Sequence, residues 1–181
     1  MAMGFAFRRW RPPALAGLLL AALLTAPPGG ARGVLAEDTD WKAGRLGHLA
    51  GAIGTYGYDR VLGDPAVAAA LAALTGGADA RTIAANMAVA APIEFMDASL
   101  VLRGNAPHRG GEEEALVMVR LFDGTVRAAL LHGGRMKLYA SDERFDYLPK
   151  VLRDFLAPRA DRPPPPARLP PGVEWVGRGR P

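Results

Sequence analysis

The sequence of 181 residues contains no cysteine. This absence excludes disulfide bonds, zinc sites with thiolate ligands, and a lipid anchor attached to a cysteine side chain. Histidine is also scarce, because the chain has only His48, His108 and His132. A metal centre built on imidazole groups needs several converging ligands. We therefore expect neither a metal nor a cofactor in this protein.

Recognisable catalytic motifs are missing as well. The chain has no nucleophile elbow and no phosphate-binding loop, and its glycines form no convincing dinucleotide-binding pattern. These absences predict that the protein is not an enzyme. One catalytic alternative stays open, a hydrolase or metal protein that would use His108 with Glu112, Glu113 and Glu114. We interpret that acidic run instead as a solvated entrance to a strand.

The first 36 residues have the pattern of a secretory signal peptide. Three arginines precede residue 12, an apolar core covers residues 14–26, and small residues follow. This core is shorter than the about 20 apolar residues that span a bilayer. We expect cleavage between Pro27 and Glu37, and a periplasmic mature protein without a membrane contact. A retained N-terminal anchor is the alternative.

The excess of positive over negative charge in the chain lies outside its central part. The formal net charge is +4, but residues 37–157 contain 16 acidic and 13 basic residues. A nucleic-acid-binding protein carries its positive charge on the folded domain, so no nucleic-acid partner is expected. A slightly acidic domain favours a basic protein partner. Residues 158–181 carry five arginines and two acidic residues, and they form a basic tail.

Residues 37–157 predict a single α+β domain. Asp64-Pro65 predicts a capped helix over residues 66–74, and Asp79 is expected to cap a second helix over residues 80–87. Five strand-like segments with turn residues between them follow, at residues 92–96, 100–102, 115–122, 125–132 and 136–139. The pattern predicts an antiparallel sheet of about five strands with helices packed on one face.

The C-terminal part changes character twice. A last helix is expected over residues 148–156, after Asp142 or Asp146. From residue 158 onward, repeated prolines remove backbone hydrogen-bond donors and oppose both helix and sheet. We therefore predict a disordered Pro- and Arg-rich tail over residues 158–181 that is dispensable to the fold. Trp175 is its only expected docking point.

The most informative residue is His108, which lies between two strand-like segments. Pro107, directly before His108, has a fixed φ angle. Gly104, Gly110 and Gly111 permit turns on either side of this pair. The chain should leave one strand, project a loop that carries a single imidazole, and return in the next strand. A titratable side chain on such a loop is typical of a binding site.

The segment from Asn105 to Glu113, followed by the apolar strand at 115–119, resembles the inhibitor of vertebrate lysozyme (Ivy) family. In that family a Pro-His pair lies between two cysteines that clamp the loop, and the loop enters the cleft of C-type lysozyme. The resemblance implies that His108 lies against the lysozyme carboxylates. The family's cysteines align with Asn105 and Gly110, and its loop aspartate aligns with Arg109. The implied partner-binding residues are Asn105, Ala106, Pro107, His108, Arg109 and Gly110.

Two functions without catalysis therefore stay open. The first is a periplasmic inhibitor of C-type lysozyme that acts through the loop around His108. The second is a protein of the same fold that no longer inhibits lysozyme and binds another partner or cell-wall material, because the loop lacks the two cysteines. A homodimer is possible in either case.

Overall fold

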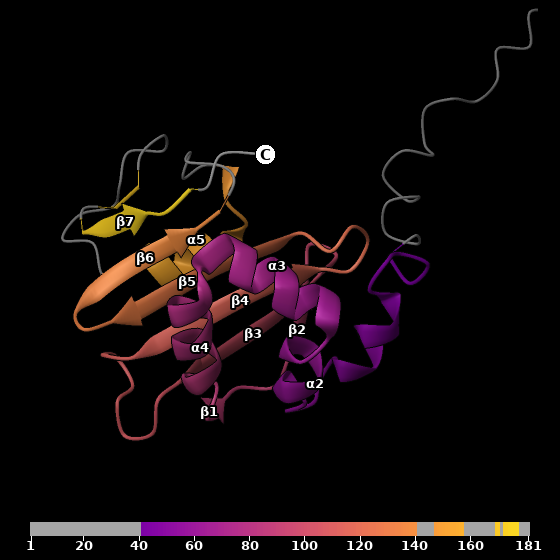
Figure 1. The fold of residues 1–181 in the computed structure, drawn as a ribbon, viewed down its shortest axis with the longest axis horizontal. Helices are drawn as coiled ribbons and strands as arrows, with labels where there is room; N and C mark the ends of the chain where they lie inside the picture. Colours follow the sequence, from indigo (N-terminus) through magenta and orange to yellow (C-terminus); the bar gives the residue numbers. More distant parts are fainter. Residues whose placement is uncertain (1–40, 141–146, 158–168, 171, 178–181) are drawn as a thin grey trace, which may run out of the picture.

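The computed structural model describes residues 41–140, 147–157, 169–170 and 172–177 of the chain, and these form an α+β fold around one sheet (Figure 1). The sheet has seven strands in the order β1-β3-β4-β5-β6-β7, and β2 pairs with β3 beside β1. Their bounds are β1 Val89–Ala90, β2 Glu94–Met96, β3 Ser99–Asn105, β4 Glu114–Arg120, β5 Val126–His132, β6 Arg135–Tyr139 and β7 Val173–Trp175.

The predicted antiparallel meander is confirmed for β2 to β6, whose neighbours in the chain pair antiparallel. Two of its turns contain two successive residues with positive φ. Asp97 and Ala98 have φ values of 51° and 54°, and Gly133 and Gly134 have 57° and 74°. Two positive φ angles in succession give the mirror-image turn that matches the twist of adjacent strands. The sheet has seven strands rather than the expected five, because the very short β1 and the C-terminal β7 also pair with it.

One face of the sheet is covered by the N-terminal half of the chain. The covering elements are the 3-10 helix η1 Gly47–Ala52 and the helices α2 Tyr58–Leu62, α3 Pro65–Thr75 and α4 Gly77–Ala85. Val67, Leu71 and Ile83 of α3 and α4 are buried against the strand residues of this face. The helical pair is therefore a cover for the sheet, as the spacing of its apolar residues predicts.

The two expected helix caps have different outcomes. The Asp64 cap is confirmed, because its Oδ1 atom accepts hydrogen bonds from the backbone N–H groups of Ala66 and Val67. The Asp79 cap is wrong, because α4 begins at Gly77, three residues before the expected start, and Asp79 lies inside its first turn. The Asp79 carboxylate instead accepts hydrogen bonds from the Lys137 Nζ atom, at 2.9 Å, and from the Tyr139 hydroxyl. It therefore ties α4 to β6.

Helices cover both faces of the sheet, so the prediction of helices on one face is wrong. Helix α5 (Lys150–Leu156) packs on the face opposite α3 and α4 and appears behind the sheet in Figure 1. Its residues Val151 and Leu152 are buried against Leu116 and Met118 of β4. Alternate residues of β4 thus enter two separate cores, which explains why its sequence is continuously apolar. The residues expected to cap α5, Asp142 and Asp146, lie outside the described residues.

The prediction that the chain beyond residue 158 stays outside the fold is wrong for residues 173–175. These form β7, which pairs in parallel with Met136–Leu138 of β6. Trp175, which the sequence names as the only candidate docking point of the tail, does dock, because its Nε1 atom donates a hydrogen bond of 3.1 Å to the Ala140 carbonyl oxygen. Val176 follows and donates from its backbone N–H to the Leu138 carbonyl oxygen. Residues 158–168, 171 and 178–181 of the expected tail lie outside the described residues, and so does the expected leader, residues 1–36.

Candidate functional site

The strongest candidate site is the connection between β3 and β4, residues 106–113, which we call the His108 loop. The last residue of β3, Asn105, pairs with the first residue of β4, Glu114, so the loop closes directly on the end of the ladder. Residues 107–112 are all exposed. The predicted arrangement of strand, projecting loop and strand is confirmed.

His108 lies at the corner of a tight turn at the tip of this loop. The Arg109 backbone N–H donates a hydrogen bond of 3.1 Å to the Ala106 carbonyl oxygen. Pro107 occupies the second position of this turn, and His108 occupies the third with a φ of 59°. A proline followed by a residue with positive φ is the pattern of a type II turn. None of the described residues forms a hydrogen bond with the imidazole, which is left pointing to solvent.

A second turn brings the chain back to β4. The Arg109 carbonyl oxygen accepts hydrogen bonds from the backbone N–H groups of Glu112, at 3.0 Å, and Glu113, at 2.9 Å. The loop is then closed by a hydrogen bond of 3.0 Å from the Ala106 N–H to the Glu113 carbonyl oxygen. Gly111 adopts a φ of 86° in this turn, where an L side chain is strained. The loop therefore has a defined backbone although few of its side chains are buried.

Asn105 and Gly110 lie next to one another across the base of the His108 loop. A Cβ atom placed on Gly110 would lie 3.8 Å from the Asn105 Cγ atom, an ordinary contact distance. The Asn105 Nδ2 atom donates a hydrogen bond of 2.8 Å to the Ala106 carbonyl oxygen. An amide side chain therefore occupies the space between the two positions that align with the family's cysteines, and it stabilises the start of the loop by hydrogen bonding.

Glu113 ties the base of the loop to the turn between β5 and β6. Its side chain is only 6% exposed. Its Oε2 atom lies 2.5 Å from the His132 Nδ1 atom, and its Oε1 atom accepts a hydrogen bond of 3.2 Å from the Gly133 backbone N–H. The hydrogen bond from His132 is the main reason why the pKa of Glu113 is lowered, against the opposing effect of burial. The carboxylate is therefore ionised and accepts a hydrogen bond that His132 Nδ1–H donates.

Arg109 folds back onto the acidic residues of its own loop. Its guanidinium lies 3.5 Å from the Glu112 carboxylate and 3.4 Å from that of Glu113. The Glu112 contact is between side chains that are both more than half exposed, so it contributes little to stability. The contact with the buried Glu113 adds to the lowering of its pKa. Arg109 thus belongs to the loop's internal contacts.

The interpretation of the acidic run as a solvated strand entrance is wrong for Glu113, and the sequence contains a signal for its burial. Ala115, Val117 and Val119 alternate along β4 on the face covered by α3 and α4, and Glu113 continues that row. His132 continues the corresponding row of β5 after Leu130. The period-2 pattern of the strands therefore places both side chains on the same face.

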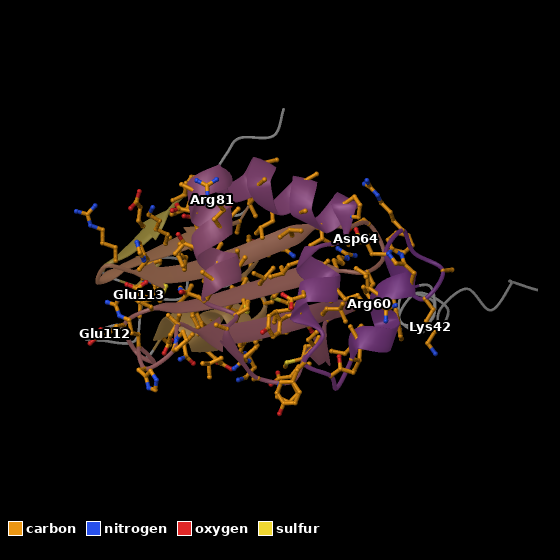
Figure 2. All side chains as sticks on the ribbon, turned by 60° about the horizontal axis from the view of Figure 1, so that its bottom comes forward. Lys42, Arg60, Asp64, Arg81, Glu112 and Glu113 are labelled. Atoms are coloured by element: carbon orange, nitrogen blue, oxygen red, sulfur yellow. The ribbon has the colours of Figure 1, made fainter. Side chains whose placement is uncertain are left out.

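The third imidazole, that of His48, lies away from this site. His48 Nε2 lies 2.8 Å from the Asp64 carboxylate, near the start of α3. Figure 2 labels Asp64 and Glu112 at opposite ends of the sheet, so His48 is remote from the His108 loop. Within the described ranges, no group of three or more His, Cys, Asp or Glu side chains is arranged to hold a metal ion. No helix in the same ranges is long and apolar enough to cross a bilayer.

The lowered pKa of Glu113 leads to a pH-dependent prediction. A carboxyl group whose pKa is lower in the folded state stabilises the fold above its unfolded pKa, and this stabilisation is lost as pH falls through the folded pKa. We expect Glu113→Gln to destabilise the protein at pH 7 by about 2 kcal/mol. The difference in free energy of unfolding should shrink below the usual carboxyl pKa of 4.5. Urea unfolding of the parent and of Glu113→Gln from pH 7 to pH 3 measures this difference. A difference that stays constant over this range would contradict the prediction.

Comparison with known protein families gives one match. A family model described as inhibitor of vertebrate lysozyme (Ivy) matches residues 66–161, which is more than half of the chain. The matched region begins in α3 and includes the whole His108 loop and α5. No curated protein and no solved structure matches the chain.

Proposed function

Because the chain belongs to the inhibitor of vertebrate lysozyme (Ivy) family, we propose that it inhibits C-type lysozyme by inserting its His108 loop into the enzyme's active-site cleft. The observation that carries this proposal is the position of His108. It is an exposed imidazole at the corner of a hydrogen-bonded turn, on a loop that projects from two central strands. The family's members are inhibitors, and the proposal therefore assigns no catalytic role to the loop.

The chemistry of the target supports this arrangement. A glycosidase cleft contains a pair of carboxyl groups on either side of the scissile bond, and one of them has a raised pKa. An imidazole donates and accepts hydrogen bonds through its two nitrogens, so His108 is able to bind both carboxyl groups at once. The turn formed by Ala106, Pro107 and Arg109 then fills the space that the sugar chain would occupy.

The direct test is inhibition by the purified mature protein. Lysis of a bacterial cell suspension by a C-type lysozyme, followed as loss of turbidity, should slow in proportion to the protein added. A lysozyme with an unrelated fold is the control, and its activity should be unaffected. Absence of both inhibition and calorimetric binding with the C-type enzyme would favour the alternative, a binding protein of this family that acts on another partner or on cell-wall material.

We propose that the mature protein acts in the periplasm, where an exported lysozyme inhibitor would meet its target. The basic start, apolar core and small residues of the first 36 positions support export. Intact-mass measurement on periplasmic extract should show a new N-terminus between Pro27 and Glu37. Recovery of the protein with Met1 in the membrane fraction would contradict both the location and the cleavage.

A designed disulfide should strengthen inhibition. A Cβ atom on Gly110 would lie within contact distance of the Asn105 side chain, and Gly110 does not have a positive φ that would exclude a side chain. We expect oxidised Asn105→Cys/Gly110→Cys to bind lysozyme about tenfold more tightly, because a covalent clamp reduces the ordering entropy lost on binding. Calorimetry of the oxidised and reduced forms measures the gain, and the reduced form is the matched control. Equal affinities of the two forms would contradict this expectation, because they would show that the clamp does not reduce the entropy lost on binding.

A further inference from the structure

We propose that Glu113 is a positioning residue that holds the His108 loop in its binding conformation through a non-covalent clamp to His132 and Gly133. This inference rests on the proposed function, because the conformation that matters is the one that presents His108. It assigns a role to two side chains outside the partner-binding segment from Asn105 to Gly110.

The main chain of Glu113 closes the loop on itself. Its carbonyl oxygen accepts the hydrogen bond from the Ala106 N–H, and its own N–H donates to the Arg109 carbonyl oxygen. Ala106 and Arg109 are the first and last residues of the turn that carries His108. A shift of the Glu113 backbone would therefore disturb both ends of this turn.

The side chain of Glu113 fixes that backbone to a different part of the sheet. Its two carboxylate oxygens bind His132 Nδ1, at 2.5 Å, and the Gly133 N–H, at 3.2 Å, in the turn between β5 and β6. Arg109 approaches the same carboxylate at 3.4 Å from within the loop. The carboxylate thus links the His108 turn, the end of β4 and the neighbouring hairpin. Figure 2 shows Glu113 at this end of the sheet, beside the more peripheral Glu112.

Burial distinguishes this clamp from an ordinary surface ion pair. The Glu113 side chain is 6% exposed, whereas that of Glu112 is 72% exposed. Water cannot easily replace a partner lost by a buried carboxylate, so the loss of His132 leaves an unfavourable charge. The exposed loop residues have few buried contacts that would keep them in place. The order of the loop therefore depends on hydrogen bonds. Those made by the Glu113 carboxylate are the best shielded from water.

Hydrogen exchange in the free protein tests the clamp without lysozyme. The informative amides are those of Arg109, Glu112 and Glu113, which donate within the loop. Glu113→Gln should raise their exchange rates about tenfold or more, while amides in the β4–β5 ladder report any global destabilisation. Glu112→Gln is the matched control, because it removes a neighbouring exposed carboxylate, and should leave these rates unchanged. Equal loop exchange in parent and Glu113→Gln would overturn the clamp.

Substitution of His132 provides a test that leaves the buried residue intact. His132 is 55% exposed, so its replacement leaves little empty space in the core. His132→Ala should loosen the same three amides, and His132→Asn should restore much of their protection, because the asparagine amide is able to donate from nearly the same position as Nδ1. Equal loop protection in His132→Ala and the parent would also overturn the clamp.

Binding measurements then connect the clamp to inhibition. Glu113→Gln should weaken binding to C-type lysozyme about tenfold, because the loosened loop must be ordered on binding. Adding the oxidised Asn105→Cys/Gly110→Cys pair to Glu113→Gln should restore the lost affinity, which a defect elsewhere in the fold would not allow. Unchanged affinity despite faster loop exchange would overturn the positioning role. Failure of the parent itself to bind lysozyme would instead overturn the proposed function, and the exchange data would still decide whether the clamp exists.

Discussion

Replacement of His108 should remove most of the inhibition while leaving the fold intact. If the imidazole is the central contact, His108→Ala should weaken binding to C-type lysozyme by about 2 kcal/mol or more, which is roughly a 30-fold increase in Kd. The residue is exposed at the corner of a turn and makes no hydrogen bond within the described ranges, so its removal takes little from the folded state. Calorimetry and inhibition assays measure the loss of binding.

The positive φ of His108 makes a second variant useful. Alanine is less tolerant than histidine of a φ of 59°, whereas asparagine adopts this conformation readily. His108→Asn should therefore keep the turn and still lose the imidazole contact. His48→Ala is the matched control, because His48 is an exposed histidine paired with Asp64 at the other end of the sheet. Parent-like inhibition by both His108 variants would remove this residue from the mechanism.

Truncation after Ala157 should lower stability markedly, in contrast to the sequence-based expectation of a dispensable tail. It would remove β7, leave the β6 edge unpaired, and expose the core residues now covered by Leu169 and Trp175. Loss of a partly buried tryptophan and a short parallel strand should reduce the free energy of unfolding by about 3 kcal/mol. For a domain of this size the melting temperature should fall by roughly 10 °C.

Two point variants distinguish the contribution of the Trp175 side chain from that of the backbone pairing of β7. Trp175→Ala should reproduce much of the truncation's effect, because it removes the contacts of the ring and its hydrogen bond to Ala140. Glu174→Ala is the matched control, because this neighbouring side chain points to solvent on the same strand. Thermal unfolding followed by circular dichroism measures all three. A truncated protein that melts within about 2 °C of the parent would show that β7 is dispensable, because such a shift corresponds to only about 0.5 kcal/mol in the free energy of unfolding.

The amino-acid sequence is sufficient to predict the features that depend on near neighbours in the chain. Asp64 followed by Pro65 fixes the start of α3, and the Gly133-Gly134 pair fixes a hairpin, because each acts through backbone conformation or a hydrogen bond a few residues away. The His108 loop was predictable for the same reason, since Pro107 and the nearby glycines specify turns between two apolar strands. The candidate site could thus be placed on the chain before the fold was known.

Tertiary structure decided the features that depend on distant partners. Glu113 and His132 are 19 positions apart, and only the pairing of β4 with β5 brings them into contact. Trp175 reaches Ala140 across 35 positions, and residues 173–175 of the expected tail form a strand of the sheet. The continuously apolar run of β4 indicates a strand covered on both faces, but only the packing of α5 shows which element covers the second face. Local sequence thus fixed the turn that presents His108, and long-range pairing fixed the contacts that hold it.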